Sequence, residues 1–290
     1  MKKLAKVFAV SAAILLLFAL LVGALYRIFT DKEWVRKEYG RIGIEAQSGY
    51  TVDQAAYVLG AMMDYSMGFI DGLGDVSVEE NGASVRFFNE RELSHMVDVR
   101  ALTGRFMRLG LAALILGLAL FAASFLILKS EGIVFFSKAF LIVLGVLAAL
   151  IAAIGIWMAV DFNSFWLRFH EVFLDLESSY FSWNESRMIR ICPAELFSDF
   201  IKHFALIAGL GLIAPVSVSA VMLFLRKRLK GDERSPRFAI VYLLSSAVIV
   251  CLITNIVTGI EPFRIVGMTG LLAVSVLNII NARQSRKDPS

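Results

Sequence analysis

The sequence predicts an all-α polytopic membrane protein with about six transmembrane helices and an extracytoplasmic cap that contains a small β-hairpin. Of its 290 residues, 58% are hydrophobic and only 19% are charged. The apolar residues also gather in runs of about 20, the length that an α-helix needs to cross a bilayer. A soluble domain could not bury that much apolar surface, and a net charge of +4 is too small to indicate a nucleic-acid partner.

Six apolar runs are the predicted spans, and none of them contains a charged residue or a histidine. They cover residues 7–26, 109–128, 139–160, 204–225, 238–257 and 265–280. The first run follows three lysines, as the apolar part of a signal peptide does. It is longer than such a segment, however, so we interpret it as a retained anchor. Spans without charged side chains argue against an ion pump or a proton-coupled carrier.

Basic residues in the short loops orient the spans, because cytoplasmic loops are enriched in Lys and Arg. Such residues precede the first run, lie between the second and third, and follow the fourth and the sixth. Both termini are therefore expected in the cytoplasm of a plasma-membrane protein, and the two long loops, residues 27–108 and 161–203, outside. We divide the chain into a four-span core, residues 1–226, which carries the site in its outer loops, and residues 227–290. The latter are expected to form a basic cytoplasmic loop and a two-span hairpin.

The first outer loop contains three local patterns. Residues 52–70 have apolar side chains along one helical face, which predicts a helix that covers the bundle or lies on the lipid surface. Asn81-Gly82 separates two short strand-like segments and predicts a hairpin with a type I′ turn. Asn89 with Glu92 three residues later indicates a helix start, and we expect this helix to continue into the second span.

Three residues of this helix form a candidate site. Glu92, His95 and Asp98 are three residues apart, so a carboxylate lies about one turn on either side of the imidazole. Such a carboxylate can orient an imidazole and raise its basicity. The same spacing is also typical of a capped, solvated start of a membrane helix.

The second outer loop begins at Asp161 with an aromatic stripe at helical spacing. The members of the stripe are Phe162, Phe165, Trp166, Phe169 and Phe173. An aromatic stripe at a membrane boundary is typical of an interfacial belt. His170 lies beside it and is expected on the same side of the membrane as His95. The sequence alone leaves open whether the two imidazoles meet.

Two segments resemble blocks of a bacterial integral-membrane family, the lipoprotein intramolecular transacylases (Lit). Residues 89–100 contain the family's spacing Glu-x-x-His-Met-x-Asp-Val, and residues 161–170 with residues 189–197 resemble its second block. The order of spans and loops is similar to the family's over about residues 1–226. Residues 231–290 have no counterpart in the family pattern.

The resemblance implies a membrane-embedded acyltransferase. It would move the sn-2 acyl chain of a lipoprotein's diacylglyceryl-cysteine to the α-amino group of that cysteine, which gives a lyso-form lipoprotein. His95 and His170 would be the catalytic residues, on the extracytoplasmic face. The partners would be the diacylglyceryl-modified lipoprotein N-terminus and membrane lipid, with no cofactor and no metal.

Two histidines suit this reaction because it needs two proton transfers. The attacking amine, with a pKa near 8, must lose a proton, and the departing glycerol oxygen must gain one. We predict His95 as the base and His170 as the acid, and an acyl-imidazole relay is an alternative. The supporting carboxylates are Glu92, Asp98 and Asp161.

Neighbouring residues are expected to contact the substrate. Arg100 and Arg105 are candidates for contact with lipid phosphates or with the peptide. The candidates for contact with acyl chains are Phe165, Trp166 and Phe169. Arginines and aromatic residues at a membrane boundary are also ordinary interfacial anchors, so these assignments have a simpler alternative.

Two other functions fit the same residues. His95, His170 and one nearby carboxylate match the ligand set of a metal-dependent membrane hydrolase, although no His-Glu-x-x-His motif is present. A non-enzymatic membrane sensor or assembly subunit would instead bind a partner through its outer loops. Metal-independent activity that is lost on substitution of either histidine would distinguish the transacylase from both.

Overall fold

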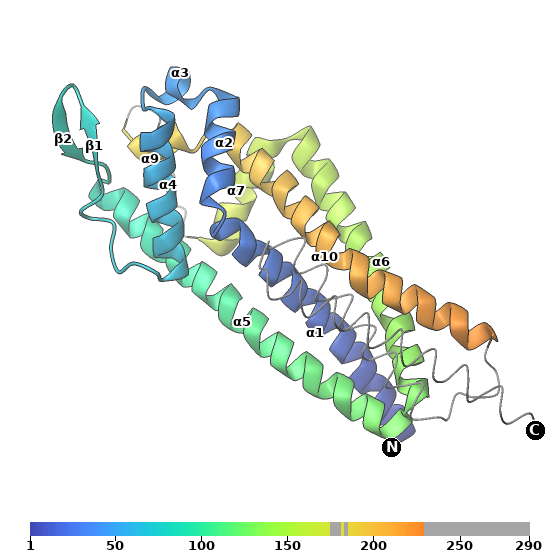
Figure 1. Cartoon of the computed structure of the whole chain (residues 1–290). Helices are drawn as coiled ribbons and strands as arrows, with labels where there is room; N and C mark the ends of the chain where they lie inside the picture. The colour runs from blue at the N-terminus through green and yellow to red at the C-terminus, as the bar shows by residue number, and fades with distance from the viewer. Residues whose placement is uncertain (175–180, 183–184, 229–290) are drawn as a thin grey trace, which may run out of the picture. The chain divides into compact units, whose positions relative to one another are not determined.

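The computed structural model of the chain describes residues 1–174, 181–182 and 185–228 (Figure 1). This part is mainly helical and includes one two-stranded antiparallel sheet. The predicted fifth and sixth spans, residues 238–257 and 265–280, lie outside the described residues. Among the described residues the structure supports four apolar helices and a small sheet, and the fifth and sixth spans stay predictions.

Four helices of the described part are long and apolar enough to cross a membrane. They are α1 (Lys2–Phe29), α5 (Glu90–Leu128), α6 (Ser130–Val160) and α10 (Ala194–Arg228). Each contains one of the first four predicted runs, so the apolar pattern located these helices correctly. The helices extend beyond the apolar runs because polar caps and amphipathic turns continue the same hydrogen-bond ladder outside them.

The two ends of α5 show how local sequence sets its length. Asn89 Oδ1 accepts a hydrogen bond from Glu92 N at 2.9 Å, and Glu92 Oε2 accepts one from Asn89 N at 2.8 Å. This reciprocal pair starts the helix at Glu90, as predicted. At the other end, the turn to α6 is the single residue Lys129, at φ 51°. Lys138, one of the basic residues between the second and third apolar runs, lies inside α6.

The chain forms two compact units, and each of the four long helices contributes residues to both. The span unit consists of residues 1–21, 111–148 and, within the described part, 206–228. The loop unit consists of residues 22–110 and 149–205, which include both predicted outer loops. Its short elements are α2 (Lys32–Ile42), α3 (Ile44–Ser48), α4 (Val52–Met67), β1 (Ser77–Glu80), β2 (Ala83–Arg86), α7 (Phe162–Phe173) and α9 (Arg187–Ile191).

A hydrophobic core holds the loop unit together. Its fully buried side chains come from both outer loops and include Val35, Tyr39, Phe87, Ile191 and Leu196. The Tyr39 hydroxyl donates a hydrogen bond to the Ile191 carbonyl at 2.7 Å. The predicted amphipathic helix is α4, which packs against α2 within this core. The two segments predicted as outer loops are thus parts of one folded unit.

The predicted hairpin is also present. β1 and β2 are antiparallel, with Glu80 opposite Ala83. Asn81 and Gly82 form the turn between them, with φ values of 53° and 81°. Positive φ at both central residues is the geometry of a type I′ turn, and Asn and Gly adopt it with little strain.

In the span unit the helices approach closely through small residues. Ala13 and Leu17 of α1 pack against Ala139 and Phe140 of α6. A Cβ atom on Gly117 of α5 would lie 2.9 Å from Leu16 Cγ, so this crossing requires glycine. Membrane helices commonly use small residues in this way, because close backbone approach replaces the hydrophobic driving force that lipid does not supply.

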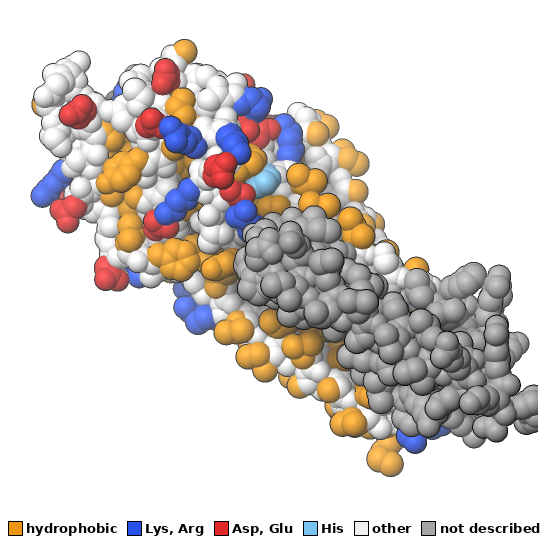
Figure 2. Space-filling model, viewed as in Figure 1, with side chains coloured by type: hydrophobic (Ala, Val, Ile, Leu, Met, Phe, Trp, Pro, Cys, Tyr) orange, Lys and Arg blue, Asp and Glu red, His pale blue; other side chains and the backbone are white. Residues whose placement is uncertain are grey.

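The two kinds of surface differ in composition. Figure 2 shows charged side chains gathered over the short elements of the loop unit and hydrophobic side chains along the long helices. On α6, for example, Ile142, Val146 and Ile156 are exposed. Exposed apolar side chains along a helix of this length suit a lipid environment, which agrees with the predicted membrane location.

Candidate active site

The two predicted catalytic histidines meet inside the loop unit. The ring centroids of His95 and His170 lie 6.2 Å apart, and the ring planes are inclined by only 18°. The imidazoles are 8% and 9% exposed, so both are almost wholly out of water. His95 comes from the polar first part of α5 and His170 from α7. The fold thus brings together one histidine from each outer loop.

His170 is oriented by a backbone carbonyl and by aromatic rings. Its Nδ1 lies 2.8 Å from the Trp166 carbonyl oxygen, one helical turn earlier. The rings of Trp166 and Phe169 lie 4.6 Å and 5.7 Å from the imidazole. Asp161, predicted as a supporting carboxylate, caps α7 by accepting a hydrogen bond from Ser164 N at 3.0 Å. Asp161 therefore fixes the start of the helix that presents His170.

His95 lies against a residue that the sequence analysis did not identify. The Phe181 ring is 5.5 Å from the imidazole and nearly perpendicular to it, and the Arg91 guanidinium lies 5.7 Å above that ring. His95 Nδ1 is buried and has no hydrogen-bond partner among the described residues. Phe181 is far from His95 in sequence, and no local pattern around it indicates the contact.

Burial keeps both imidazoles neutral near pH 7. His95 precedes the apolar part of α5, which begins at residue 109, and therefore lies outside the span. Burial lowers the pKa of His95 to about 4, the nearby His170 contributes further, and Asp98 opposes the shift. Burial also lowers the pKa of His170, and its hydrogen bond to the Trp166 carbonyl partly offsets this. The pair can accept a proton, but two positive charges would repel each other.

Glu92 occupies a different place from the one predicted. Its side chain is fully buried, and Oε1 accepts hydrogen bonds from Ser186 Oγ at 2.6 Å and from Met188 N at 2.9 Å. Oε2 accepts the hydrogen bond from Asn89 N. These three donors come from the start of α5 and the start of α9. The carboxylate thus joins the two predicted outer loops, and within the described residues none of its hydrogen bonds goes to His95.

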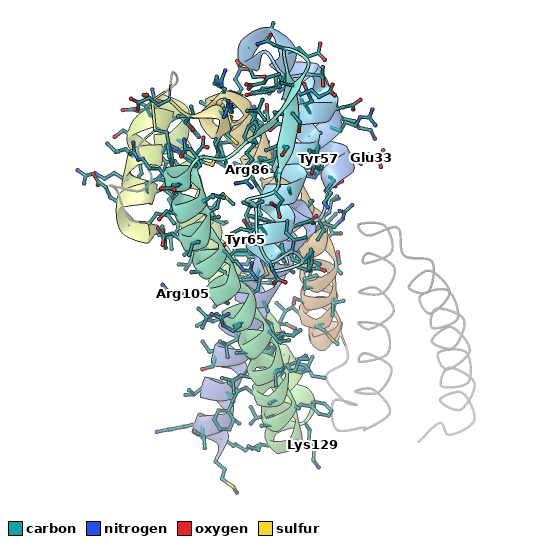
Figure 3. The ribbon with its side chains drawn as sticks, turned by 90° about the vertical axis from the view of Figure 1, so that its left-hand side faces the viewer. Glu33, Tyr57, Tyr65, Arg86, Arg105 and Lys129 are labelled. Carbon is teal, nitrogen blue, oxygen red and sulfur yellow. The ribbon has the colours of Figure 1, made fainter. Side chains whose placement is uncertain are left out.

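The two predicted arginines differ in their surroundings. The Arg100 guanidinium lies 4.7 Å above the Tyr65 ring and donates to the Ile70 carbonyl at 3.0 Å, so it holds the segment after α4 against α5. In Figure 3, Tyr65 lies on the side of α4 that faces α5, whereas Arg105 points away from α4. Arg105 is exposed and has no ion-pair partner in the described part of the chain.

The aromatic stripe packs partly on itself and partly on neighbouring helices. Phe165 is 5.6 Å from Trp157 and perpendicular to it, and Trp166 is 4.2 Å from Phe197 of α10. Phe169 lies 5.1 Å from Phe173. All five members of the stripe remain partly exposed. The stripe therefore forms an apolar surface next to His170.

The third histidine belongs to a separate cluster. The His203 ring stacks on Trp34 at 4.5 Å with planes inclined by 7°, and its Nε2 lies 3.5 Å from Asp31 Oδ2. These contacts give His203 a packing role between α10 and the start of α2.

No group of three or more His, Cys, Asp and Glu residues in the described ranges is arranged to hold a metal ion. The ligand set that the hydrolase alternative requires, two histidines and a carboxylate, is thus not assembled among these residues. Glu92 directs its oxygens to the α5 and α9 donors, and Asp161 caps α7. This part of the chain therefore offers no support for the metal-dependent alternative.

Comparison with solved structures identifies similar folds. The membrane-integral lipoprotein intramolecular transacylase Lit from Bacillus cereus matches with a TM-score of 0.59 at 15% sequence identity, over 81% of this chain and 99% of that chain. Two forms of the same protein with a histidine replaced by alanine or by arginine match with TM-scores of 0.56 and 0.58, at 14% and 16% identity. These two matches cover 79% and 80% of this chain and 95% of each of theirs. At such low identity the structures establish the fold alone.

Sequence comparison establishes the family. The family model described as lipoprotein intramolecular transacylase Lit matches residues 9–197, more than half of the chain. No curated protein matches the sequence as a relative. The matched segment includes both histidine blocks that resembled this family. The chain therefore belongs to the Lit family of lipoprotein intramolecular transacylases, and it is a membrane-embedded acyltransferase that acts on lipoproteins.

Proposed function

We propose that His95 and His170 are the catalytic pair of this transacylase. The observation that carries the proposal is the meeting of the two imidazoles, 6.2 Å apart between centroids, although they come from different outer loops. Their burial beside an apolar aromatic surface suits a reaction on a lipid ester. Membership in an enzyme family also removes the support for a non-enzymatic sensor or assembly subunit.

The reaction moves an acyl chain within one substrate molecule. The α-amino nitrogen of the diacylglyceryl-cysteine attacks the carbonyl carbon of the sn-2 ester, and the bond from that carbon to the glycerol oxygen breaks. One proton leaves the nitrogen and one reaches the glycerol oxygen, so an amide and a free sn-2 hydroxyl form. Because both reacting groups belong to the same molecule, correct orientation supplies a large part of the acceleration.

His170 is the better candidate for the base. A carbonyl oxygen only accepts hydrogen bonds, so the Trp166 contact places the imidazole proton on Nδ1 and leaves the lone pair on Nε2. The same carbonyl stabilises the imidazolium that forms when Nε2 takes the amine proton. His170 then returns this proton to the departing glycerol oxygen. These roles reverse the assignment predicted from the sequence, which relied on carboxylates beside His95.

His95 suits a neutral role. With a pKa of about 4 it stays uncharged while His170 carries the proton. A neutral imidazole keeps one N–H, which can donate to the ester carbonyl oxygen as negative charge develops there. A donor that is already in place and out of water stabilises such charge strongly. Asp98, one turn after His95, partly offsets the lowering of the imidazole pKa that burial causes.

The remaining substrate contacts follow from the surfaces around the pair. Phe165, Trp166 and Phe169 supply an apolar surface for the acyl chains. Arg105 is exposed on α5 ahead of the span, where a lipid phosphate or the lipoprotein peptide would meet it. We place this site on the extracytoplasmic face of the membrane, because the basic loops are expected in the cytoplasm. Arg100 we assign to the fold rather than to the substrate.

The direct test is tandem mass spectrometry of a lipoprotein N-terminal lipopeptide. The lipoprotein would come from a host without its own N-acylation of lipoproteins, with and without this protein. Intramolecular transfer conserves mass, so fragmentation must locate the acyl chain. We expect it on the cysteine nitrogen, and on glycerol again in the His95→Ala and His170→Ala proteins. An unchanged diacylglyceryl pattern, with the protein shown to be inserted, would overturn the proposal.

A further inference from the structure

We infer that Glu92 is a positioning residue of the transacylation. Its buried carboxylate joins the turn of α5 before His95 to α9, and α9 is followed by α10, which packs against the helix that carries His170. The inference deepens the proposed function and rests on it. Glu92 is fully buried, and its three hydrogen-bond donors are Asn89 N, Ser186 Oγ and Met188 N. The last two lie 94 and 96 residues away in the sequence.

The bonds to Ser186 and Met188 exceed what a helix cap needs. A capping box requires only the reciprocal bonds between Asn89 and Glu92, and it forms readily at an exposed helix start. Burial of a carboxylate is costly unless several donors satisfy it. Here Oε1 takes one donor from the Ser186 hydroxyl and one from the backbone of Met188. The arrangement therefore serves to hold α9 against α5.

The link continues from α9 to His170. α9 is followed closely by α10, whose Phe197 ring packs 4.2 Å from the Trp166 ring. The Trp166 carbonyl in turn holds Nδ1 of His170. Glu92 lies three residues before His95 on the same helix. Its carboxylate thus connects the elements that carry the two imidazoles, and a shift of α9 relative to α5 would change their separation.

A second anchor on α9 provides a matched control. Arg187 pairs with Glu80 of β1, with Nε 3.1 Å from Oε1 and a second nitrogen 3.2 Å from Oε2, and it also donates to the Arg86 carbonyl at 3.3 Å. This anchor holds the hairpin to α9, on a path that does not include either histidine. Arg187→Gln therefore tests loss of polar contacts on α9 without loss of the Glu92 link.

The experiment compares kcat, KM and Tm of the full-length protein in lipid vesicles, with a synthetic diacylglyceryl-cysteine peptide as substrate. The variants are Glu92→Gln, Ser186→Ala, Arg187→Gln and His170→Ala. A glutamine has one acceptor oxygen, so it cannot satisfy all three donors. Since small misplacements of catalytic groups cost up to about 100-fold, we expect Glu92→Gln to lower kcat about 10-fold to 100-fold with KM unchanged. Ser186→Ala, which keeps the carboxylate, should give a smaller loss of the same kind.

The outcomes separate positioning from stability. Arg187→Gln is expected to lower Tm with kcat unchanged. Glu92→Gln protein that is folded, with a lower Tm and a normal kcat, would overturn the inference. If the Glu92→Gln protein does not fold, the Ser186→Ala protein is the test instead. A normal kcat of Ser186→Ala would then overturn the inference. An active His170→Ala protein would instead refute the catalytic pair, and the inference with it.

Discussion

His95 and His170 lie on two helices that the loop unit holds in place by different means. The turn of α5 that carries His95 is fixed by hydrogen bonds, chiefly those that the buried Glu92 carboxylate accepts from the start of α9. α7, which carries His170, is fixed mainly by rings, with Trp166 packed 4.2 Å from Phe197. One histidine of the proposed catalytic pair therefore depends on polar contacts and the other on apolar packing.

The difference follows from where each helix begins. The first part of α5 is polar, and a fully buried acceptor there makes hydrogen bonds that are strong because water is absent. α7 follows directly after the apolar helix α6, at the predicted membrane boundary, where aromatic rings pack well without hydrogen-bond partners. We therefore expect the His95 side to respond to loss of donors or acceptors, and the His170 side to loss of ring volume.

Removal of an imidazole should have the largest effect. General acid–base catalysis contributes about 10²–10⁴ in rate, so His170→Ala is expected to lower kcat within that range. His95→Ala, which removes a hydrogen-bond donor but no proton acceptor, should lower kcat less than His170→Ala does, within the range of about 10²-fold to 10³-fold for one lost donor. Both rates would be measured with the diacylglyceryl-cysteine peptide in lipid vesicles.

The third histidine is the control for these substitutions. His203 stacks on Trp34 within the loop unit and contacts neither catalytic ring. His203→Ala is expected to lower Tm and to leave kcat unchanged. A larger loss of kcat for His95→Ala than for His170→Ala would refute our assignment of the base and restore the one predicted from the sequence.

The pH dependence sharpens the assignment further. Burial lowers the pKa of His170 below its usual 6.5, so the neutral base persists into more acidic solution. The substrate amine, with a pKa of about 8, must also be neutral, so kcat/KM should rise about tenfold per pH unit from roughly pH 6.5 to 8 and then level off. Protonation of His170 should steepen the decline only below pH 6.5. A decline of kcat/KM above neutral pH would show that a protonated histidine is required instead.

Loss of ring volume next to His170 should have an intermediate effect. Trp166→Ala keeps the backbone carbonyl that binds His170 but removes the ring packed on Phe197. Since the helix can then shift, we expect kcat to fall about tenfold. Leu167→Ala, at the exposed neighbouring position, is the matched control and should behave like the unmodified protein. Equal rates for both variants would show that α7 does not depend on aromatic packing.

The local patterns of the sequence predicted most of the fold that the structure describes. Apolar runs located the four long helices, Asn81-Gly82 located the hairpin turn, and Asn89 with Glu92 located the start of α5. Each of these patterns depends on residues close together in the chain, and on the physical chemistry of a single helix or turn. α2 and α3 were missed, although Asp31 caps the start of α2 and Gly43, at φ 65°, ends it.

The site was predictable only in part. The spacing of Glu92 and His95 suggested a carboxylate that supports the imidazole, but Glu92 binds Ser186 and Met188, which no local spacing could indicate. Likewise, the carbonyl that orients His170 belongs to Trp166, and a backbone acceptor leaves no mark in a sequence. Contacts across more than 90 residues depend on how the two loops pack together.

Helix packing within the predicted spans offers a test that is independent of catalysis. A Cβ atom on Gly110 of α5 would lie 2.5 Å from Val22 Cγ1 of α1, whereas one on Gly155 of α6 would meet nothing within 4 Å. We expect Gly110→Ala to destabilise the protein by about 1–3 kcal/mol, as overpacking usually does. Gly155→Ala should leave Tm unchanged or raise it slightly, since alanine favours helix more than glycine. Thermal unfolding in one detergent would compare them, and equal Tm values would contradict the close crossing.

The smallest effects are expected from substitution of Arg100 and Arg105. These substitutions test which polar residues of α5 stabilise the fold and which contact the substrate. Arg100 holds the Ile70 carbonyl and the Tyr65 ring, so Arg100→Gln should cost about 1 kcal/mol of stability through these contacts. Arg105 has no such partner in the described residues, so Arg105→Gln should leave Tm unchanged. If Arg105 binds a lipid phosphate or the lipoprotein, Arg105→Gln raises KM instead. The rise in KM should be larger in low-salt buffer, because exposed charges are then less screened. A fall in Tm for Arg105→Gln would contradict the assignment of Arg105 to substrate contact. An unchanged Tm for Arg100→Gln would contradict the assignment of Arg100 to the fold.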